Sequence, residues 1–447
     1  MVLQSRNVFR LPARLNVRMC YRYMQTVSAA VSGKPRAESL KNSRDQAVFP
    51  VHEFILTQIR HDVLLKDAYE GRVVDKKKIG RESLNCEPNV SNLSVSSLTQ
   101  KLQALAHQEV VDFIKDLAHS ALSEETFDTD INILQIVENE CCLRARNWDS
   151  ASLLLVTDAF CVLHYRCSHY LSAMFREFEH RWTSMAVGKE DVVQLAMCII
   201  MGRKFPRLLV RNIENFVNSS VEEFSAGELS VICLAFFITN TSFRNVDVME
   251  KLANAVLHSL PSASLKVHQL GSILKALRHA QFSKLSFYNR LGRSLTSSTM
   301  LQTESSLNDL SNIAFTYASL RISSPALFTS VSTNAVRLIQ NRSRVRLKDV
   351  GRIVWSFALL QEPLDRVVQN QLLILLRRDL HLMEQFSQAF VEALLGLAML
   401  QTYPLDLLQR LFSTKFPKDE HGVVIFAVLH CTLLIAVCDS DCLFVCF

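Results

Sequence analysis

Apolar residues recur along this chain with the spacing of an α-helix, and the helical pattern itself repeats about every forty residues. Four residues at i, i+3, i+4 and i+7 share one helical face: Val350, Ile353, Val354 and Phe357. Residues of the same kind occupy the matching places in residues 309–320 and 390–401. An internal repeat of this length is typical of a helical array.

A second amphipathic helix follows each of these segments, so the unit is a helical hairpin. The second helices are predicted at residues 171–178, 208–217, 246–257, 287–295, 325–339, 364–376 and 405–412. The first helices are centred on Val156, Ala196, Ile232, Ile273, Ile313, Ile353 and Ala393, in steps of 40, 36, 41, 40, 40 and 40. A lone hairpin cannot bury its apolar face, whereas stacked hairpins share a continuous core. The pattern therefore predicts an all-α fold, an α-solenoid of about seven helical-hairpin repeats.

Composition agrees with a mostly helical protein from a reducing compartment. The chain has only 11 Gly and 10 Pro in 447 residues, and 49% of its residues are apolar. Its 12 cysteines are scattered and form no C-x-x-C pair, so we do not expect a disulfide scaffold.

The first 36 residues are basic and contain no acidic residue. They hold seven Lys or Arg, and five arginines are four residues apart: Arg6, Arg10, Arg14, Arg18 and Arg22. Such a segment is typical of a mitochondrial presequence, so residues 1–36 are predicted to direct the protein to the mitochondrial matrix. The alternative is a basic tail that binds polyanions, and Pro12 argues against one uninterrupted helix.

Two further segments precede the repeats. Residues 37–97 are predicted to be a linker with one possible helix, because the later part of this stretch is rich in charge and in Asn and Ser. Residues 98–149 have helical spacing without the repeat register and are predicted to form a helical N-terminal cap. The repeat array is assigned to residues 150–416.

Positive charge is concentrated in the middle of the array. Residues 266–352 contain 13 Lys or Arg against three Asp or Glu, although the net charge of the whole chain is only +6. Such a patch on a concave repeat surface suits nucleic acid, because guanidinium groups fork onto phosphates and stack on unpaired bases. The predicted RNA-binding residues are Lys275, Arg278, Lys284, Arg290, Arg293, Arg321, Arg337, Arg342, Arg344, Arg346, Lys348 and Arg352. The alternative is that these charges only lie on solvated faces of surface helices and bind no partner.

Aromatic residues of the same region follow the apolar register: Phe315, Tyr317, Trp355 and Phe357. Aromatic rings can stack on unpaired bases. Their spacing nevertheless predicts that these four rings lie in the core.

The sequence carries no motif of a catalytic or cofactor-binding site. It lacks the phosphate-binding glycine loops, the zinc-protease helix signature and the nucleophile elbow. Cys141 and Cys142 lie beside Glu138 and Glu140, but adjacent cysteines chelate one metal ion poorly. We therefore expect no enzyme activity, no cofactor, no metal and no small-molecule substrate.

The C-terminal tail, residues 417–447, differs in composition from the array. Residues 423–438 form a run of sixteen that is apolar apart from one histidine and one threonine. Three interpretations stay open: a membrane anchor, a last buried helix or strand, or residues 422–447 that are not native and come from an incorrect gene model. Sixteen residues fall short of the roughly 20 that span a bilayer, so membrane contact is not expected. A zinc site from the cysteines and the histidine of the tail lacks a standard spacing.

The unit L-x-x-I-[AVL]-x-[ST]-[FY]-A-x-L, at residues 310–320 and 350–360, resembles the heptatricopeptide-type repeats of mitochondrial RNA-binding proteins. These proteins belong with the FAST-kinase-like and RAP-domain family, and the resemblance is strongest over residues 270–412. It implies an α-solenoid that binds organellar RNA, in transcript processing or stability or in a mitochondrial ribosome with fragmented rRNA. Family members often carry a RAP domain after the repeats, whereas only 31 residues follow Phe416 here.

Residues and resemblance together predict a non-enzymatic mitochondrial protein that binds single-stranded organellar RNA, either rRNA or mRNA. Mitoribosomal proteins are a further expected class of partner. The alternative is a protein-binding α-solenoid scaffold of the armadillo or HEAT type, in which the basic segment meets an acidic protein. Salt separates the two in part, because about five phosphate contacts give log K against log[salt] a slope of about −3.5.

Overall fold

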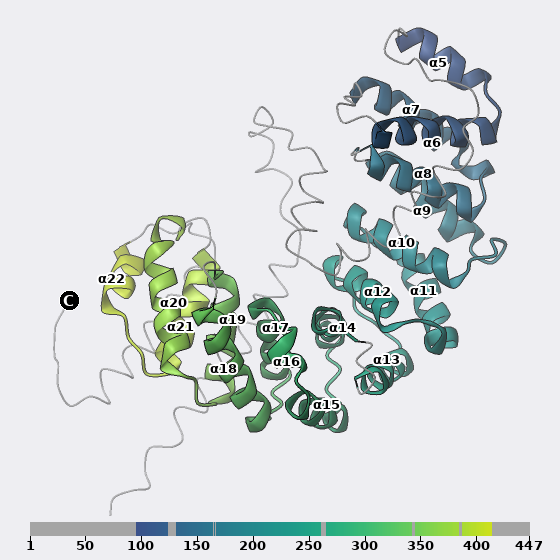
Figure 1. The fold of residues 1–447 in the computed structure, drawn as a ribbon. Helices are drawn as coiled ribbons and strands as arrows, with labels where there is room; N and C mark the ends of the chain where they lie inside the picture. Colours follow the sequence, from purple (N-terminus) through teal and green to yellow (C-terminus); the bar gives the residue numbers. More distant parts are fainter. Residues whose placement is uncertain are drawn as a thin grey trace, which may run out of the picture. The chain divides into compact units, whose positions relative to one another are not determined.

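The structure, a computed structural model, is an array of packed helices over the residues that it describes, which confirms the predicted α-solenoid (Figure 1). It describes residues 95–123, 131–163, 165, 167–260, 265–341, 345–383 and 387–413. The predicted presequence, most of the predicted linker, residues 414–416 at the end of the predicted array and the predicted tail at residues 417–447 lie outside these residues. No described helix combines the length and the apolar character needed to cross a membrane.

From residue 150 onward the helices begin and end close to where the apolar period places them. The first helices are α8 (Ser150–Val162), α10 (Lys189–Gly202), α12 (Ala226–Ile238), α14 (Val267–His279), α17 (Leu307–Ser319), α19 (Leu347–Leu360) and α21 (Ser387–Met399). The second helices are α9 (Ser168–Arg181), α11 (Arg207–Ser220), α13 (Val246–Ser259), α15 (Leu285–Ser297), α18 (Pro325–Gln340), α20 (Arg366–Arg378) and α22 (Leu405–Ser413). A short helix, α16 (Met300–Thr303), lies between α15 and α17 and was not predicted, because four residues carry no helical period.

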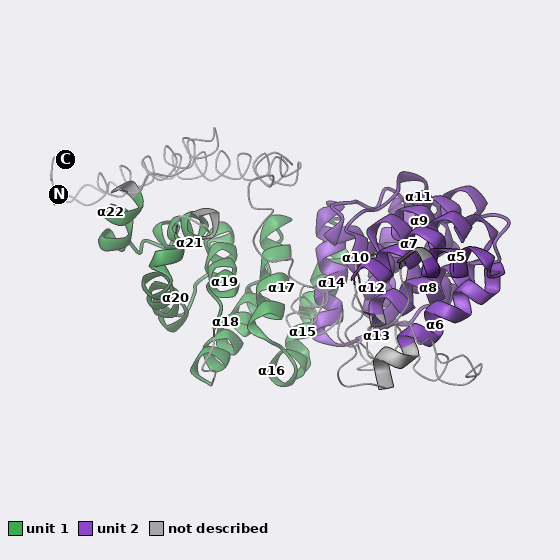
Figure 2. Cartoon of the chain, turned by 90° about the horizontal axis from the view of Figure 1, so that it is seen from above, with its two compact units in different colours: residues 1–45, 283–447 green, residues 46–282 purple. Residues whose placement is uncertain are grey.

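The chain divides into two compact units at the turn between α14 and α15 (Figure 2). Unit 2 ends at Phe282, and its described helices are α5 to α14. The described helices of unit 1 begin after Ser283 and are α15 to α22.

Unit 2 contains two rows of stacked helices. The first-helix row is α6 (His107–Ser123), α8, α10, α12 and α14, and the second-helix row is α5 (Val95–Ala104), α7 (Ile131–Arg144), α9, α11 and α13. First helices are covered on several sides, so nearly all of residues 192–200 in α10 are buried. Second helices bury one stripe, as Leu209, Ile213 and Val217 do in α11. Helices α6 and α7 pack on α8 and α9 as the later hairpins pack on one another.

Unit 1 repeats this arrangement. Helices α17, α19 and α21 form its first-helix row, and α15, α18 and α20 form its second-helix row. The Tyr317 hydroxyl of α17 donates a hydrogen bond of 2.8 Å to the backbone carbonyl of Tyr288 in α15. A Cβ atom at Gly396 would lie 3.3 Å from the backbone of Trp355, so this glycine allows α21 to approach α19 closely.

Carboxylates join successive second helices of unit 2. Glu138 of α7 is buried, and it accepts hydrogen bonds from the backbone N–H groups of His169 and Tyr170 at the start of α9, at 2.8 and 3.0 Å. Glu214 of α11 accepts one from the N–H group of Arg244, just before α13, at 2.5 Å. The first N–H groups of a helix lack intrahelical partners and favour a negative charge. These bonds therefore fix how each hairpin sits on its neighbour.

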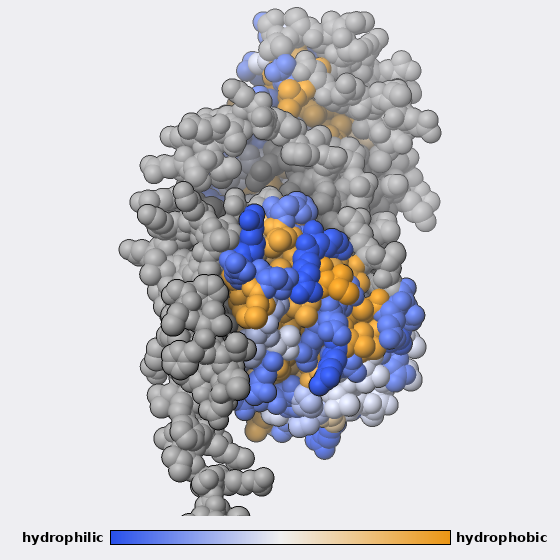
Figure 3. Space-filling view, turned by 90° about the vertical axis from the view of Figure 1, so that its left-hand side faces the viewer, coloured by the Kyte–Doolittle hydropathy of each residue, from blue (hydrophilic) through white to orange (hydrophobic). Residues whose placement is uncertain are grey.

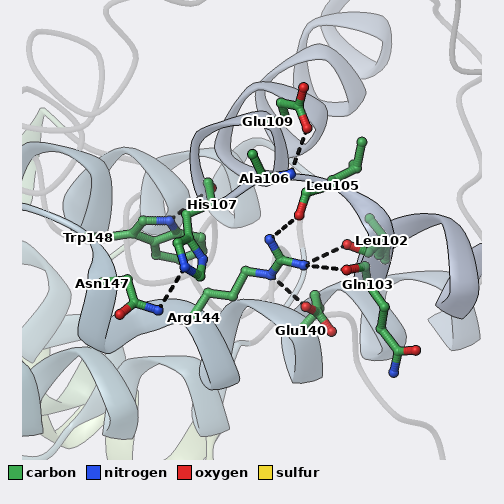
Figure 4. Close-up of polar contacts among 10 residues, drawn as sticks. All are labelled: Leu102, Gln103, Leu105, Ala106, His107, Glu109, Glu140, Arg144, Asn147 and Trp148. Carbon is green, nitrogen blue, oxygen red and sulfur yellow. Dashed lines mark hydrogen bonds and ion pairs between the residues drawn. The ribbon is translucent and has the colours of Figure 1, made fainter.

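Arg144 of α7 binds the C-terminal end of α5 (Figure 4). Its guanidinium donates hydrogen bonds to the carbonyl oxygens of Leu102, Gln103 and Leu105, at 2.8, 3.3 and 2.5 Å. It also forms an ion pair of 2.6 Å with Glu140, and the arginine is only 7% exposed. The last carbonyl groups of a helix have no intrahelical partner, so Arg144 completes the C-terminus of α5.

Candidate nucleic-acid interface

In unit 2, two of the predicted RNA-binding residues cover an aromatic ring. Lys275 and Arg278 lie on one face of α14, three residues apart. The Lys275 Nζ is 5.9 Å and the Arg278 Cζ is 5.8 Å from the ring centroid of Phe237 on α12. All three side chains are half-buried. A cation within about 6 Å of a ring face is attracted to it, so these cations are held against the first-helix row.

Unit 1 contains a contact of the same kind. The guanidinium Cζ of Arg352 on α19 lies 5.5 Å from the ring centroid of Phe315 on α17. Burial lowers the pKa of Arg352, while Glu392 and Asp349 act in the opposite direction. The guanidinium stays charged in a protein, so it keeps a positive charge on this partly desolvated surface.

In each unit, therefore, a half-buried ring on one first helix meets a cation from the next first helix. The prediction that four aromatic residues lie in the core is confirmed for Tyr317, Trp355 and Phe357, which are 0, 3 and 0% exposed. It is wrong for Phe315, which is half-buried because it lies at the margin of the apolar stripe, beneath Arg352. Rings combined with cations form the kind of surface on which unpaired bases stack.

Arg346 has a structural partner. Its Nε and Nη2 atoms lie 2.8 and 3.0 Å from the two carboxylate oxygens of Asp349, and Nη2 also donates to the Asn308 side chain at 3.2 Å. This guanidinium therefore ties the start of α19 to the start of α17. Lys348, in the first turn of α19, is exposed. The other predicted residues of this turn, Arg342 and Arg344, lie outside the described residues.

The remaining predicted residues of unit 1 are spread over other parts of it. Arg290 and Arg293 are exposed on α15, in the second-helix row, and Lys284 immediately precedes that helix. Arg337 of α18 is half-buried and donates a hydrogen bond of 3.4 Å to Asn334. Arg321 is exposed directly after α17. Within unit 1, the basic residues of this segment therefore lie on both rows of helices and at both ends of the helices, and they do not form one surface.

Four exposed basic residues of unit 2 were not predicted as candidates. Arg203, Lys204 and Arg207 lie in and just after the turn between α10 and α11, and Arg244 lies in the turn between α12 and α13. The signal in the sequence was the run GRKFPR, with three cations in five residues and no acid.

Unit 1 also exposes apolar side chains among hydrophilic ones, on the face seen in Figure 3. Val367 and Ile374, two helical turns apart on α20, are 37 and 57% exposed, and Leu405 of α22 is 73% exposed. Exposed apolar side chains on these two helices are compatible with a contact to another protein.

Comparison with known proteins gives distant relatives. No protein-family model matches the chain. The chain is 21% identical over 319 residues to FAST kinase domain-containing protein 5, mitochondrial, of Homo sapiens, an alignment that covers 71% of this chain and 40% of that protein. The protein of the same name from Mus musculus is 22% identical over 290 residues, covering 64% of this chain and 37% of the relative. The chain is therefore distantly similar to a mitochondrial FAST kinase domain-containing protein, and the match spans about two fifths of that relative's length.

Proposed function

We propose that this chain is a mitochondrial RNA-binding helical-repeat protein. It would act in the processing or stability of organellar RNA, or in the assembly of a mitochondrial ribosome with fragmented rRNA. The observation that carries the proposal is the pairing of cations with half-buried rings on the first-helix row of each unit, Arg278 with Phe237 and Arg352 with Phe315. Single strands are the expected form of RNA, because only unpaired bases offer their faces for stacking.

Two observations support a mitochondrial location. The relatives are named mitochondrial. Residues 1–36 carry seven basic residues and no acid, as a matrix-targeting segment does. We accordingly propose the matrix as the compartment in which the protein meets organellar RNA.

We propose a binding role without catalysis. The sequence contains none of the phosphate-binding loops or nucleophile motifs considered above. Cations would neutralise phosphates, and the rings beside them would receive bases.

The test combines crosslinking with a charge variant. The variant Lys275→Gln, Arg278→Gln, Arg352→Gln removes the three cations that lie against rings. The matched control, Lys101→Gln, Arg176→Gln, Lys251→Gln, removes three exposed cations of unit 2 that lie outside the basic segment. Each protein is expressed in mitochondria and crosslinked, and the attached RNA is sequenced. Wild type and control should recover discrete organellar rRNA or mRNA fragments, and the ring-face variant should recover fewer. Wild type that recovers no RNA above background would refute the proposal.

A second candidate function is a protein-binding scaffold of the armadillo or HEAT type. The exposed apolar side chains of α20 and α22 favour it, because such surface is commonly covered by another protein. A mitoribosomal protein would be a suitable partner. If the crosslinked complexes contain protein alone, and added RNA does not displace it, this function replaces RNA binding.

A further inference from the structure

Every positive φ angle among the described residues occurs at one recurring place, one or two residues after the end of a first helix. The six residues are Arg203, Asn240, Gln281, Arg321, Gln361 and Gln401, with φ between 49 and 60°. They are 37, 41, 40, 40 and 40 residues apart, and all six side chains are exposed. None of the six is glycine.

The backbone around these residues closes the helix in the same way in both units. After α17, the N–H group of Arg321 bonds to the carbonyl of Ala318 at 3.1 Å, and that of Ile322 bonds to the carbonyl of Tyr317 at 2.9 Å. The same pair of bonds recurs at Asn240, Gln281, Gln361 and Gln401. This is the Schellman ending of a helix, whose left-handed residue is usually glycine.

Neighbouring turns of this kind lie side by side within each unit. In unit 2 the Ser242 hydroxyl, in the turn after α12, donates to the carbonyl of His279 at the end of α14, at 3.4 Å. In unit 1 the Ser323 hydroxyl, in the turn after α17, donates to Glu362 in the turn after α19, at 2.9 Å. Each unit thus has one edge along which a left-handed residue recurs once per repeat. We call this edge of unit 2 the αL edge and define it by residues 203–207, 239–245 and 281.

Two of the three left-handed residues on this edge, Arg203 and Gln281, are of types that the conformation does not favour. A left-handed conformation is unfavourable for an L-residue, asparagine tolerates it best, and glutamine and arginine have no special tolerance. Long or polar side chains stand at all six left-handed positions, three of them on the αL edge, where glycine would cost less, and this points to a role for the side chains themselves. Strain that persists at corresponding sites points in the same direction.

Charge distinguishes the αL edge from the opposite edge of unit 2. Residues 203–207 and 239–245 contain four basic residues and no acidic one: Arg203, Lys204, Arg207 and Arg244. The opposite edge lies at the starts of α10 and α12, which Lys189 joins through its ion pair of 3.4 Å with Glu228. That edge is acidic and holds Glu190, Asp191, Glu222, Glu223 and Glu228. Two carboxylates from second helices also reach the αL edge, where Glu179 and Glu214 accept from the N–H groups of Leu208 and Arg244. With four basic residues against these two acids, the αL edge still favours a polyanion more than the acidic edge does.

We infer that the αL edge of unit 2 is a second RNA-contacting surface, separate from the cation–ring contacts of the first-helix row. Its four basic residues neutralise phosphates, and Asn240 and Gln281 donate and accept hydrogen bonds at the edges of unpaired bases. The inference rests on the proposed function, and its test is arranged so that failure of the inference can be told apart from failure of the proposed function.

The first test uses a charge variant of the full chain and a matched control. The edge variant is Arg203→Gln, Lys204→Gln, Arg207→Gln, Arg244→Gln. The control removes four exposed basic residues elsewhere in unit 2, Lys101→Gln, Arg146→Gln, Arg176→Gln, Lys251→Gln. Binding of a fluorescein-labelled oligouridylate is measured over a range of salt concentrations.

The edge variant should bind about tenfold or more weakly, with a salt slope shallower by about 3, because each phosphate contact on a single strand contributes about 0.7. The control should bind as wild type does. Equal losses in the two variants, or no loss in the edge variant, would overturn the inference while leaving RNA binding intact. Wild type that fails to bind would overturn the proposed function and the inference with it.

The second test separates the side chains from the fold. Asn240→Gly with Gln281→Gly relieves two left-handed residues and should raise the midpoint of thermal unfolding. If the amide side chains contact bases, the same variant should bind oligouridylate about fivefold more weakly, the value of about one hydrogen bond. A more stable protein with unchanged RNA affinity would contradict the role of these amides.

Discussion

Replacing Arg144 by methionine should loosen the N-terminal end of unit 2. The arginine is 7% exposed and forms an ion pair with Glu140. Its guanidinium also donates three hydrogen bonds to carbonyl groups in the last turn of α5 and just after it. Methionine replaces the aliphatic stem of the arginine but leaves Glu140, 9% exposed, without its cation. Breaking a buried pair by removing one partner costs about 3–5 kcal/mol.

The loss should be local, because stacked repeats are stabilised by their neighbours and a terminal helix can open by itself. A cost of about 3 kcal/mol corresponds to a more than 100-fold increase in the open population of α5. Hydrogen exchange read by mass spectrometry should therefore show faster exchange in peptides from α5 and the start of α6. Peptides from α12 and α14 should exchange as in wild type.

Two controls define what would refute this reasoning. Arg146→Met changes an exposed arginine two residues away and should leave exchange in α5 unchanged. Adding Glu140→Leu to Arg144→Met should recover part of the protection, since it removes the unpaired charge. If α5 exchanges in the Arg144 variant at the wild-type rate, the guanidinium does not hold the helix. If all of unit 2 exchanges faster, the array does not open locally.

Three further substitutions and one chemical modification test the fold and its titratable groups. Gln361→Gly should raise the unfolding midpoint by about 2–4 °C in a calorimetric scan, because a left-handed residue costs about 1 kcal/mol that glycine avoids; an unchanged or lower midpoint would contradict this. Glu214→Leu should lower the free energy of unfolding in urea by about 1–3 kcal/mol, since the N–H group before α13 loses its acceptor, and a loss within error would show that water replaces the carboxylate. Asp149 caps α8, and its hydrogen bonds with Ser152 hold its pKa below the ordinary value. It therefore contributes stability above the unfolded pKa of about 3.9 that is lost as pH falls, so Asp149→Ala should be less stable than wild type near neutral pH and the gap should close in acid. Burial raises the pKa of Cys142 to about 11, so iodoacetamide should modify this thiol slowly at neutral pH until the protein is unfolded, as peptide mass mapping would show.

Much of the array was predictable because its first helices bury nearly continuous apolar runs and its second helices bury regular stripes. The predicted second helices at 246–257 and 325–339 correspond to Val246–Ser259 and Pro325–Gln340. The hairpin of α6 and α7 escaped the register for a physical reason. Its core side carries three charged groups on α7, which are buried because each has a partner: Glu138 bonds to the start of α9, Arg144 bonds to the end of α5, and Glu140 pairs with Arg144 within α7. An apolar pattern cannot reveal polar groups that are buried in pairs.

The candidate site was predictable only in part, because a hairpin distributes a basic segment over several surfaces. Because the chain turns between helices, Arg293 lies on the second-helix row, Arg321 lies just after a first helix and Arg352 lies on the first-helix row. Net charge over a window does not contain this information. The ring beneath Arg352 follows from the position of Phe315 at the margin of its stripe, which only the packing of α17 on α19 decides.

The partners of the basic residues separate those that hold the fold from those available to a polyanion. Arg144 and Arg346 both face carboxylates at close range, at 2.6 and 2.8 Å, so a phosphate would have to displace an existing partner. Replacing a carboxylate by a phosphate leaves the charge around these guanidinium groups nearly unchanged. Arg144 and Arg346 should therefore add little to the salt dependence of RNA binding. The turns of the αL edge contain no acidic residue of their own, so phosphate contacts made there should add more to the slope than contacts to Arg144 or Arg346. The number of contacts read from salt dependence should therefore follow the exposed basic turns rather than the count of Lys and Arg in the sequence.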